Sequence, residues 1–296
     1  MNGIINIYKE AGFTSFDVVA KMRGILKIKK IGHTGTLDPD ATGVLPVCIG
    51  NGTKLVELLA EHDKEYIAEL ILGIATDTQD ISGKVIKTGE VKVTREEVAK
   101  TVKDFVGEYM QVPPMYSALK VNGKKLYELA REGKEVERKA RPVCFHEIEI
   151  LSMELPVVKL RVVCSKGTYI RTLCNDIGEK LGCFAAMKSL IRTRVGCFGI
   201  EEAVTLRELE EKRDAGQLAE VVLSPDRVFG HLPEVKAKSE FCRLLDNGNT
   251  LYPNMLEKPP YFKDGAEVRV YGEERFYGIY QYVAEENKLK PLKMFL

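Results

Sequence analysis

A glycine-rich segment that carries two aspartates is the part of the sequence best suited to chemistry. Residues 32–46 read GHTGTLDPDATGVLP and contain three glycines, which permit positive φ angles and let another backbone or a ligand approach closely. Pro39 keeps Asp38 out of helical geometry, so its carboxylate projects from an irregular loop. An aspartate with a pKa near ~3.9 is ionised at neutral pH and needs no partner base to act as a nucleophile. Asp38 is therefore a candidate nucleophile, although an Asp-Pro pair in isolation more often begins a turn.

Metal and cofactor chemistry is not indicated. The seven cysteines and four histidines are dispersed and include no C-x-x-C pair, whereas a zinc site needs clustered thiolates or imidazoles. We interpret the cysteines as reduced, small hydrophobic residues. A P-loop is missing because Ala118 stands where its first glycine would, and the Gly50-x-Gly52 pair lacks the third glycine of a dinucleotide-binding loop. The sequence predicts chemistry without a metal or cofactor.

The composition describes a globular chain with an uneven distribution of charge. Of its 296 residues, 45% are hydrophobic and 29% are charged, and the formal net charge is +1. Basic residues prevail over residues 120–141, with a net charge of +4, and over residues 159–194, with a net charge of +6. A near-neutral protein of this kind can still present a basic face to a polyanion.

Two features bear on location. The longest stretch without Asp, Glu, Lys or Arg, residues 41–53, has 13 residues, whereas a membrane helix needs about 20 apolar ones. The first residues lack the basic and then apolar pattern of a secretion signal. We therefore expect a cytoplasmic protein that binds no membrane and, since nothing indicates an obligate dimer, a monomer.

Periodicity and capping patterns predict the elements that position the candidate aspartate. The predicted strands cover residues 3–8, 65–73, 143–154 and 157–164, with residues 81–88 as the hairpin partner of 65–73. The predicted helices cover residues 15–26, 54–60, 95–106, 124–131, 168–181 and 206–213, the fifth capped by Thr168. Residues 31–43 are expected to form a loop. Short β-like segments from about Leu232 onward predict a small β-rich domain.

Six segments together resemble the TruB family of tRNA pseudouridine synthases. The loop at 32–46 matches the family's GHTG-x-LDP-x-ATG-x-LP motif, and further matches follow in order and spacing. They are K-x-Y at 64–66, TDT-x-D…G at 76–83, PP-x-x-SA-x-K…G-x-x-LY at 113–127, C-x-KGTYIR-x-L at 164–173 and L-x-R-x-x-x-G at 190–196. One departure is Lys9-Glu10, where the family has Lys-Pro, a pair thought to be structural.

The resemblance implies an architecture. We expect an α+β fold whose catalytic domain, residues 1–231, has a central, mostly antiparallel β-sheet flanked by helices. The remaining residues, 232–296, would form a small β-barrel-like domain that looks like a PUA domain, the usual companion that touches the acceptor end of tRNA.

The resemblance also implies roles for three residues around the target nucleotide. Asp38 would be the catalytic aspartate, acting either by attack on C1′ of the ribose or by assisting elimination to a glycal. Tyr66 would lie against the base and take the sugar proton. Arg171 would pair with the aspartate, and we expect it to orient the carboxylate and to lower its pKa.

Further residues are implied to hold the RNA. Tyr169 and Leu190 would wall the uracil pocket, and His33 would fill the space that an extruded base leaves in the RNA. Lysines in the matched motifs are expected to contact RNA, namely Lys64, Lys120, Lys124 and Lys166.

The function implied is the isomerisation of uridine to pseudouridine at position 55 in the T loop of tRNA. Two alternatives stay open at this point. One is an RNA-binding chaperone in which folding assistance outweighs the chemistry. The other is a nucleosidase or glycosidase that releases the base, which would need a second carboxylate about 5–5.5 Å from Asp38; Asp40 is the one nearby candidate in the loop.

Overall fold

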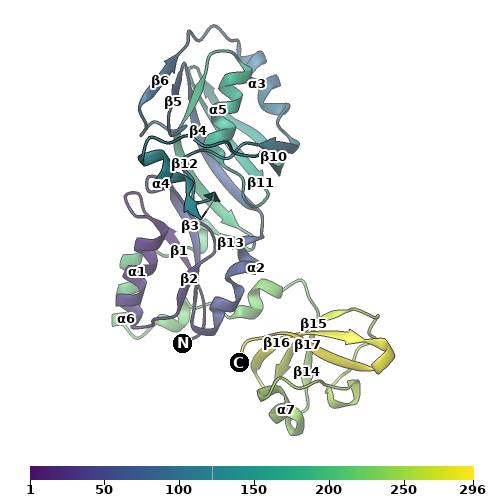
Figure 1. The fold of residues 1–296 in the computed structure, drawn as a ribbon. Coiled ribbons are helices and arrows are strands. Elements are labelled where there is room, and N and C mark those ends of the chain that lie inside the picture. Colours follow the sequence, from purple (N-terminus) through teal and green to yellow (C-terminus); the bar gives the residue numbers. More distant parts are fainter. Residues whose placement is uncertain (122) are drawn as a thin grey trace.

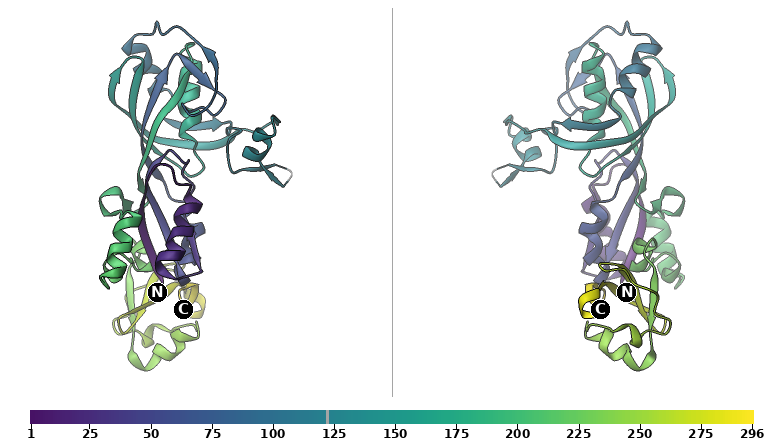
Figure 2. Two further views of the ribbon diagram at one scale, coloured as in Figure 1. Left: turned by 90° about the vertical axis from the view of Figure 1, so that its left-hand side faces the viewer. Right: turned by 90° about the vertical axis from the view of Figure 1, so that its right-hand side faces the viewer.

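The structure, a computed structural model, describes residues 1–121 and 123–296. The molecule is elongated, with one long sheet running through its main body and a smaller sheet beside the end that carries the N-terminus (Figure 1). The views in Figure 2 show that a segment between two strands of the main sheet projects sideways from this body. Among the described residues, no helix is long and apolar enough to cross a membrane.

The main sheet is built from strands spread over the first two thirds of the chain. They are β1 (Gly3–Lys9), β2 (Ile31–His33), β3 (Thr42–Ile49), β4 (Lys64–Leu72), β7 (Gly107–Gln111), β10 (Arg141–Glu154), β11 (Val157–Cys164), β12 (Ala185–Val195) and β13 (Phe198–Gly199). In the described residues the order is β1-β3-β12-β4-β11-β10-β7, with β2 paired to β3 and β13 to β12. The β3–β12 pairing is parallel and the others are antiparallel. The expected α+β fold with a mostly antiparallel sheet is confirmed.

Helices cover the two ends of this sheet separately. The chain forms α1 (Ser15–Leu26), α2 (Val56–Ala60), α3 (Arg95–Lys103), α4 (Leu126–Arg131), α5 (Ile170–Lys180), α6 (Leu206–Asp214) and α7 (Cys242–Asp246). Apolar side chains of α1 and α6 form one core with β1 and β3, whereas those of α3 and α5 form another with β4, β10 and β11. Thr14 caps α1 in a full capping box, so this predicted helix is confirmed at both ends.

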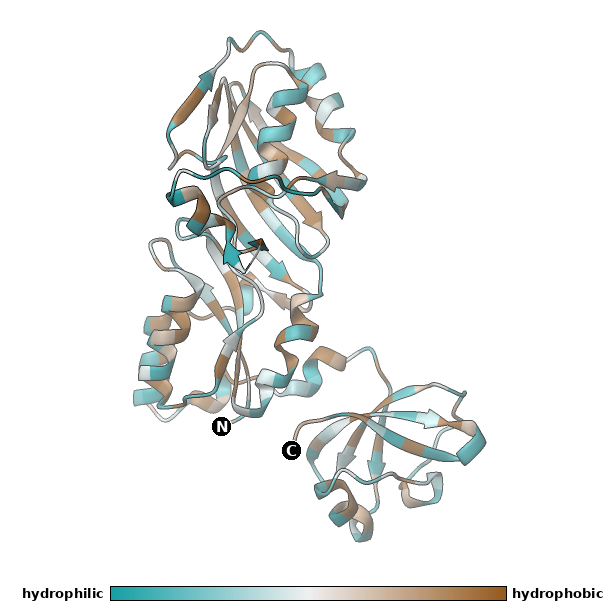
Figure 3. Cartoon of the chain, viewed as in Figure 1, coloured by the Kyte–Doolittle hydropathy of each residue, from teal (hydrophilic) through white to brown (hydrophobic). Residues whose placement is uncertain are grey.

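Strand β12 was not predicted, although it lies in the middle of the sheet. Its side chains include the charged residues Lys188, Arg192 and Arg194, and its pairing with β4 slips at two bulges. Bulges move successive side chains off strict alternation, so the period-two pattern that identifies a strand is lost. The neighbouring strand β4 keeps an alternation of buried and half-buried residues throughout, and it was predicted to within one residue. Strands of the main sheet carry both hydrophobic and hydrophilic residues (Figure 3).

Three other predictions are corrected. The expected loop at 31–43 begins with strand β2, which pairs with β3. The segment 81–88 forms β6 (Val85–Thr88), but it pairs with the short strand β5 (Ile74–Thr76) and not with β4. Thr168 does not cap α5, because its hydroxyl donates to the Ser165 carbonyl at 2.8 Å and Tyr169 occupies the N-cap position.

The small sheet consists of β14 (Glu234–Ala237), β15 (Glu267–Gly272), β16 (Arg275–Val283) and β17 (Lys288–Met294), in that order. It has its own apolar core. Aromatic residues from both parts meet where it contacts the main body, with Phe229 6.4 Å from Phe276 and 6.0 Å from Phe295 between ring centroids. Lys54 adds a hydrogen bond to the Met294 carbonyl at 3.0 Å. The two parts are therefore held together by a packed interface.

The contact between β3 and β12 joins the two halves of the main sheet. Gly43 pairs with Arg192 there, at a φ of +105°. A Cβ atom at position 43 would lie 2.1 Å from the Arg192 carbonyl oxygen. Glycine is required at this position both for its backbone conformation and for the close approach of the neighbouring strand.

A pair of alanine substitutions separates these two requirements. Gly107 has a similar φ of +110° but nothing within 4 Å of an added Cβ atom, so Gly107→Ala reports conformational strain alone, about 1–3 kcal/mol. Gly43→Ala adds the clash, and we expect its loss of unfolding free energy to exceed about 4 kcal/mol. Urea unfolding of both variants measures the difference. Equal losses in the two variants would show that the β3–β12 approach is not constrained.

Candidate functional site

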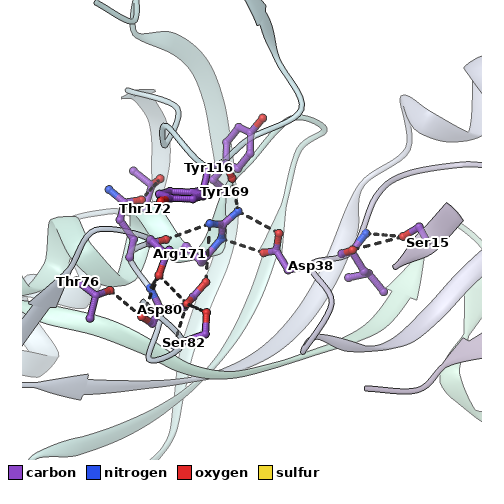
Figure 4. A network of polar contacts seen from close by, with 12 residues as sticks. Ser15, Asp38, Thr76, Asp80, Ser82, Tyr116, Tyr169, Arg171 and Thr172 are labelled. Atoms are coloured by element: carbon purple, nitrogen blue, oxygen red, sulfur yellow. Dashed lines mark hydrogen bonds and ion pairs between the residues drawn. The ribbon is translucent and has the colours of Figure 1, made fainter. Parts of the chain in front are cut away.

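The candidate site is centred on an ion pair between two residues that lie far apart in the sequence. Arg171 Nε lies 2.9 Å from Asp38 Oδ2, and Arg171 Nη2 donates to Asp38 Oδ1 at 3.0 Å (Figure 4). Two parallel contacts of this kind fix the direction of a carboxylate as well as its position. The arginine side chain is 6% exposed and the aspartate 35% exposed, so the carboxylate remains accessible while its cation does not.

The remaining donors of Arg171 are also occupied. Nη1 donates to the Thr78 carbonyl at 3.0 Å and lies 3.8 Å from Asp80 Oδ2, and Nη2 donates to the Tyr116 carbonyl at 2.8 Å. A guanidinium has five N–H groups in one plane, and acceptors lie within 3.0 Å of its three nitrogen atoms on several sides here. Asp38 is therefore held by a cation that has no freedom to turn.

Asp80 is the second carboxylate of the site and was not singled out from the sequence. Its Oδ1 accepts from the Thr78 hydroxyl at 2.7 Å and from the Ser82 amide at 3.0 Å. The residue lies in the segment TDTQD that carries part of the family resemblance, which is the signal that could have identified it. Asp40, the carboxylate that the sequence offered instead, is exposed.

Side chains from neighbouring segments fix the start of α5, and with it Arg171. Gln111 accepts from the Tyr169 amide at 2.8 Å and donates to the Tyr169 carbonyl at 3.0 Å. Thr172 donates to the Gln79 side-chain oxygen at 2.8 Å. These bonds attach the first turn of the helix to β7 and to the segment that carries Asp80.

The loop that carries Asp38 is anchored on either side of it. The Leu37 amide donates to the Ser15 hydroxyl at 2.9 Å, at the start of α1. The buried ammonium of Lys9 donates to the Pro39 carbonyl at 2.9 Å and to the Phe13 carbonyl at 2.6 Å. The lysine of the altered Lys-Glu pair thus touches the loop that carries Asp38 directly. The exposed Glu10 that replaces the family's proline contributes only its carbonyl to the same ammonium, at 3.1 Å.

Arg171 lowers the pKa of Asp38, as expected, but burial outweighs it. Burial raises the pKa of the Asp38 carboxyl above its usual range, and the attraction of Arg171, which favours the ionised form, does not fully offset the loss of hydration. The nearby charge of Asp80 also favours the neutral form. The arginine therefore orients the carboxylate and limits the rise of its pKa.

Tyr66 lies on β4, is buried, and belongs to the same apolar core as Leu37 and Ala41 of the Asp38 loop. Burial raises the pKa of its phenol, while the adjacent guanidinium of Arg192 opposes this. Arg192 is 1% exposed and donates to the Val44 carbonyl at 2.7 Å and the Gly35 carbonyl at 3.1 Å. It therefore connects the candidate tyrosine to both ends of the Asp38 loop. Sequence reasoning missed it because an arginine is rarely buried unless it is paired.

The other predicted pocket residues lie on elements around this centre. Tyr169, at the start of α5, is half-buried and Leu190, on β12, is buried. His33, at the end of β2, is half-buried and accepts from the Gly35 amide at 3.3 Å through Nδ1. Burial lowers the pKa of this imidazole, which favours the neutral form.

The four predicted RNA-binding lysines differ in exposure. Lys120 and Lys124 are exposed on the projecting segment, and Lys166 is exposed and paired with Glu61. Lys64 is buried, and its ammonium donates to the Ala60 and His62 carbonyls at 2.6 Å each. Desolvation lowers the pKa of Lys64 to about 8. A buried lysine satisfied by backbone carbonyls does not support the prediction of a phosphate contact at this position.

The stretch 159–194, with its net charge of +6, does not present a row of unpaired cations. Arg192 is buried, and the other seven basic side chains each lie within 4.0 Å of a carboxylate, four of them on Glu65 or Glu69. Local net charge overstates a basic surface when the partners come from other strands.

Comparisons with known proteins agree with this geometry. A family profile described as "TruB family pseudouridylate synthase (N terminal domain)" matches residues 23–170, and one described as "tRNA pseudouridylate synthase B C-terminal domain" matches residues 171–229. The chain is 53% identical to the tRNA pseudouridine synthase B of Lachnoclostridium phytofermentans, over 100% of both chains. It is 46% identical to that of Alkaliphilus oremlandii, over 99% of this chain and 97% of the relative.

Solved structures show the same likeness at greater distance. A Cbf5-Nop10-Gar1 complex superposes with a TM-score of 0.73 at 29% identity, covering 99% of this chain and 85% of that chain. An H/ACA RNP bound to a substrate RNA containing 2'-deoxyuridine gives a TM-score of 0.73 at 27% identity, with the same coverage. Because two family profiles cover residues 23–229 and full-length relatives are 46–53% identical, the chain belongs to the TruB family of pseudouridylate synthases.

Proposed function

We propose that this enzyme, a tRNA pseudouridine synthase, isomerises the uridine at position 55 in the T loop of tRNA, with Asp38 as its catalytic carboxylate. The observation that carries the proposal is the forked Asp38–Arg171 pair, in which an accessible anion is held by a buried cation. The isomerisation breaks the bond between N1 and C1′, turns the uracil, and forms a bond between C5 and C1′ with loss of the C5 proton. It needs a fixed carboxylate near C1′ and no redox partner.

The surroundings of Asp38 fit this reaction. A carboxylate stabilises an oxocarbenium-like centre at C1′ most effectively when its direction is set before the substrate arrives. Tyr66 takes the sugar proton in this proposal, and the adjacent Arg192 partly offsets the rise of the phenol pKa that burial causes. Attack by Asp38 on C1′ and assistance of glycal formation both use the same placement.

The projecting segment between β7 and β10, described for residues 112–121 and 123–140, supplies a basic surface for the RNA. It contains β8 (Lys120–Val121), β9 (Lys124–Lys125) and α4, and it stands clear of the main body in Figure 2. Its Tyr127 ring lies 5.3 Å from Lys125 Nζ and 5.5 Å from the Arg131 guanidinium. Cations around an aromatic ring provide the stacking and phosphate contacts by which unpaired RNA bases are bound.

The small sheet domain, which we assign to residues 232–296, is proposed to act like a PUA domain on the acceptor end of the tRNA. Its separate core and its packed contact with the main body support a second, fixed point of attachment. Catalysis is assigned to the main body, and the enzyme is expected to act as a monomer.

The first prediction separates chemistry from RNA binding. Asp38→Asn keeps the size of the side chain but removes its charge, so we expect no detectable pseudouridine and a tRNA affinity within about threefold of the unchanged enzyme, because one interior contact contributes little to a phosphate-dominated interface. Tritium release from 5-tritiated uridine measures the first and filter binding the second. Turnover at a comparable rate would rule out Asp38 as the catalytic group. Full biological rescue by this inactive variant would instead favour the chaperone alternative.

The second prediction concerns pH. The reactive form of Asp38 is the carboxylate and burial raises its pKa, so kcat/KM should fall, as pH decreases, at a higher pH than a free aspartate would give. Arg171→Met removes the main influence that lowers this pKa, so the acid limb should move further up in pH. Loss of the two-point contact with Asp38 should also lower the plateau value of kcat/KM by about 100-fold.

Arg171→Lys is the matched control, since it keeps the charge without the two-point fork. The plateau value of kcat/KM should fall in this variant, while the acid limb of its pH profile should stay near that of the unchanged enzyme. An Arg171→Met variant that folds normally and keeps the original acid limb would contradict the assigned electrostatics.

The third prediction tests the two points of attachment with the enzyme intact. A T-arm stem-loop lacks the acceptor end, so its Kd should be weaker than that of full-length tRNA by about tenfold or more. Its turnover at saturation should stay within a few-fold, because the proposed catalytic residues lie in the main body. Equal affinities for the two RNAs would argue against a tRNA contact by residues 232–296.

A further inference from the structure

A thiol, an imidazole and a carboxylate lie in a row outside the site described above. Cys144 Sγ is 3.6 Å from His146 Nδ1, and His146 Nε2 is 3.2 Å from Asp63 Oδ1. The histidine and aspartate side chains are 42% and 51% exposed, and the cysteine is half-buried. Reagents in solution therefore have access to the row, and none of its members contacts Asp38 or Arg171.

The sheet sets up this arrangement. Cys144 and His146 lie two residues apart on β10, with the fully buried Phe145 between them on the opposite face. The pairing of β10 with β11 slips between Phe145 and Glu147, which places a bulge at His146. A bulge redirects the side chain it carries. Asp63 directly precedes β4, two strands away in the sheet.

The order of the groups favours removal of the thiol proton. An anionic oxygen beside Nε2 favours a proton on that nitrogen, which leaves the Nδ1 lone pair facing the sulfur. A base at the thiol, oriented by a third group, is the arrangement that activates cysteine nucleophiles. The thiolate is the reactive form of cysteine.

The other cysteines have different surroundings. Burial raises the pKa of the Cys48, Cys164 and Cys174 thiols to about 12. It also raises the pKa of three more, Cys183, Cys197 and Cys242. Among the described residues, Cys144 is the cysteine whose sulfur has an imidazole within hydrogen-bonding distance.

We propose that Cys144 is a covalent modification site for soft electrophiles, activated by His146 and Asp63. The thiol proton moves to His146 Nδ1, the sulfur electron pair forms a bond to the electrophilic carbon, and the leaving group departs as an anion. Because the Ser165 hydroxyl accepts from the Cys144 amide at 2.8 Å and the Ser165 amide donates to the Cys144 carbonyl at 2.9 Å, an adduct would form beside the segment that leads into α5.

Alkylation of the full-length protein by iodoacetamide at pH 7 tests this proposal, with each cysteine followed by peptide mass spectrometry. Cys197 is exposed and serves as the internal reference. We expect Cys144 to react at least about tenfold faster than Cys197, because His146 stands ready to accept the thiol proton as the new bond to sulfur forms. Cys144→Ser should remove the fast phase and leave the other sites unchanged.

The neighbouring residues provide the decisive variants. His146→Ala uncovers the sulfur, so exposure alone would speed the reaction, whereas loss of the base should slow it to within about threefold of Cys197. Asp63→Asn should give an intermediate rate. The proposal is overturned if Cys144 reacts no faster than Cys197, or if His146→Ala leaves its rate unchanged or increases it. An unchanged rate in Asp63→Asn would remove the carboxylate from the activating group.

Discussion

The site depends on burying a cation in order to leave its anion accessible. Arg171 gives up nearly all contact with water, which is costly unless each of its donors finds an acceptor. Two carbonyls and Asp38 accept its hydrogen bonds, Asp80 adds an ion pair at 3.8 Å, and these groups come from three separate loops. Because the guanidinium is planar and rigid, the loops can satisfy it in one arrangement. The arginine therefore specifies where the loops meet, and the direction of Asp38 follows from that.

A second buried arginine, Arg192, fixes the position of the Asp38 loop relative to the sheet. Arg192 lies on β12, whose parallel contact with β3 joins the two halves of the main body. Its side chain bonds to carbonyls at both ends of the Asp38 loop, while its backbone lies so close to Gly43 that no side chain fits between them. The packing of β3 against β12 therefore also determines where the Asp38 loop lies. A change that separates β3 from β12 would misplace the carboxylate without touching it.

The parts of this structure that sequence reasoning could predict are those governed by local patterns. The capping residues before α1 and the approximate alternation along β4 located both elements to within one residue. Strand β12 escaped because its charged side chains are satisfied by distant partners and its bulges break the alternation. The Asp38–Arg171 contact joins residues 133 positions apart, and only the family resemblance, not spacing or composition, placed them together.

The balance at Asp38 explains why its partner has to be an arginine held from several sides. Desolvation pushes the carboxyl toward its neutral form, and Asp80 adds to that effect. A single point charge could oppose this electrostatically, but it would leave the carboxylate free to rotate about its Cβ–Cγ bond. The two parallel contacts from the Arg171 guanidinium compensate the lost hydration of the carboxylate and also prevent its rotation. Asp80 weakens the compensation slightly, yet it anchors the guanidinium on the side away from Asp38. The structure therefore combines a small electrostatic destabilisation of the carboxylate with a fixed geometry, as the proposed reaction at C1′ would require.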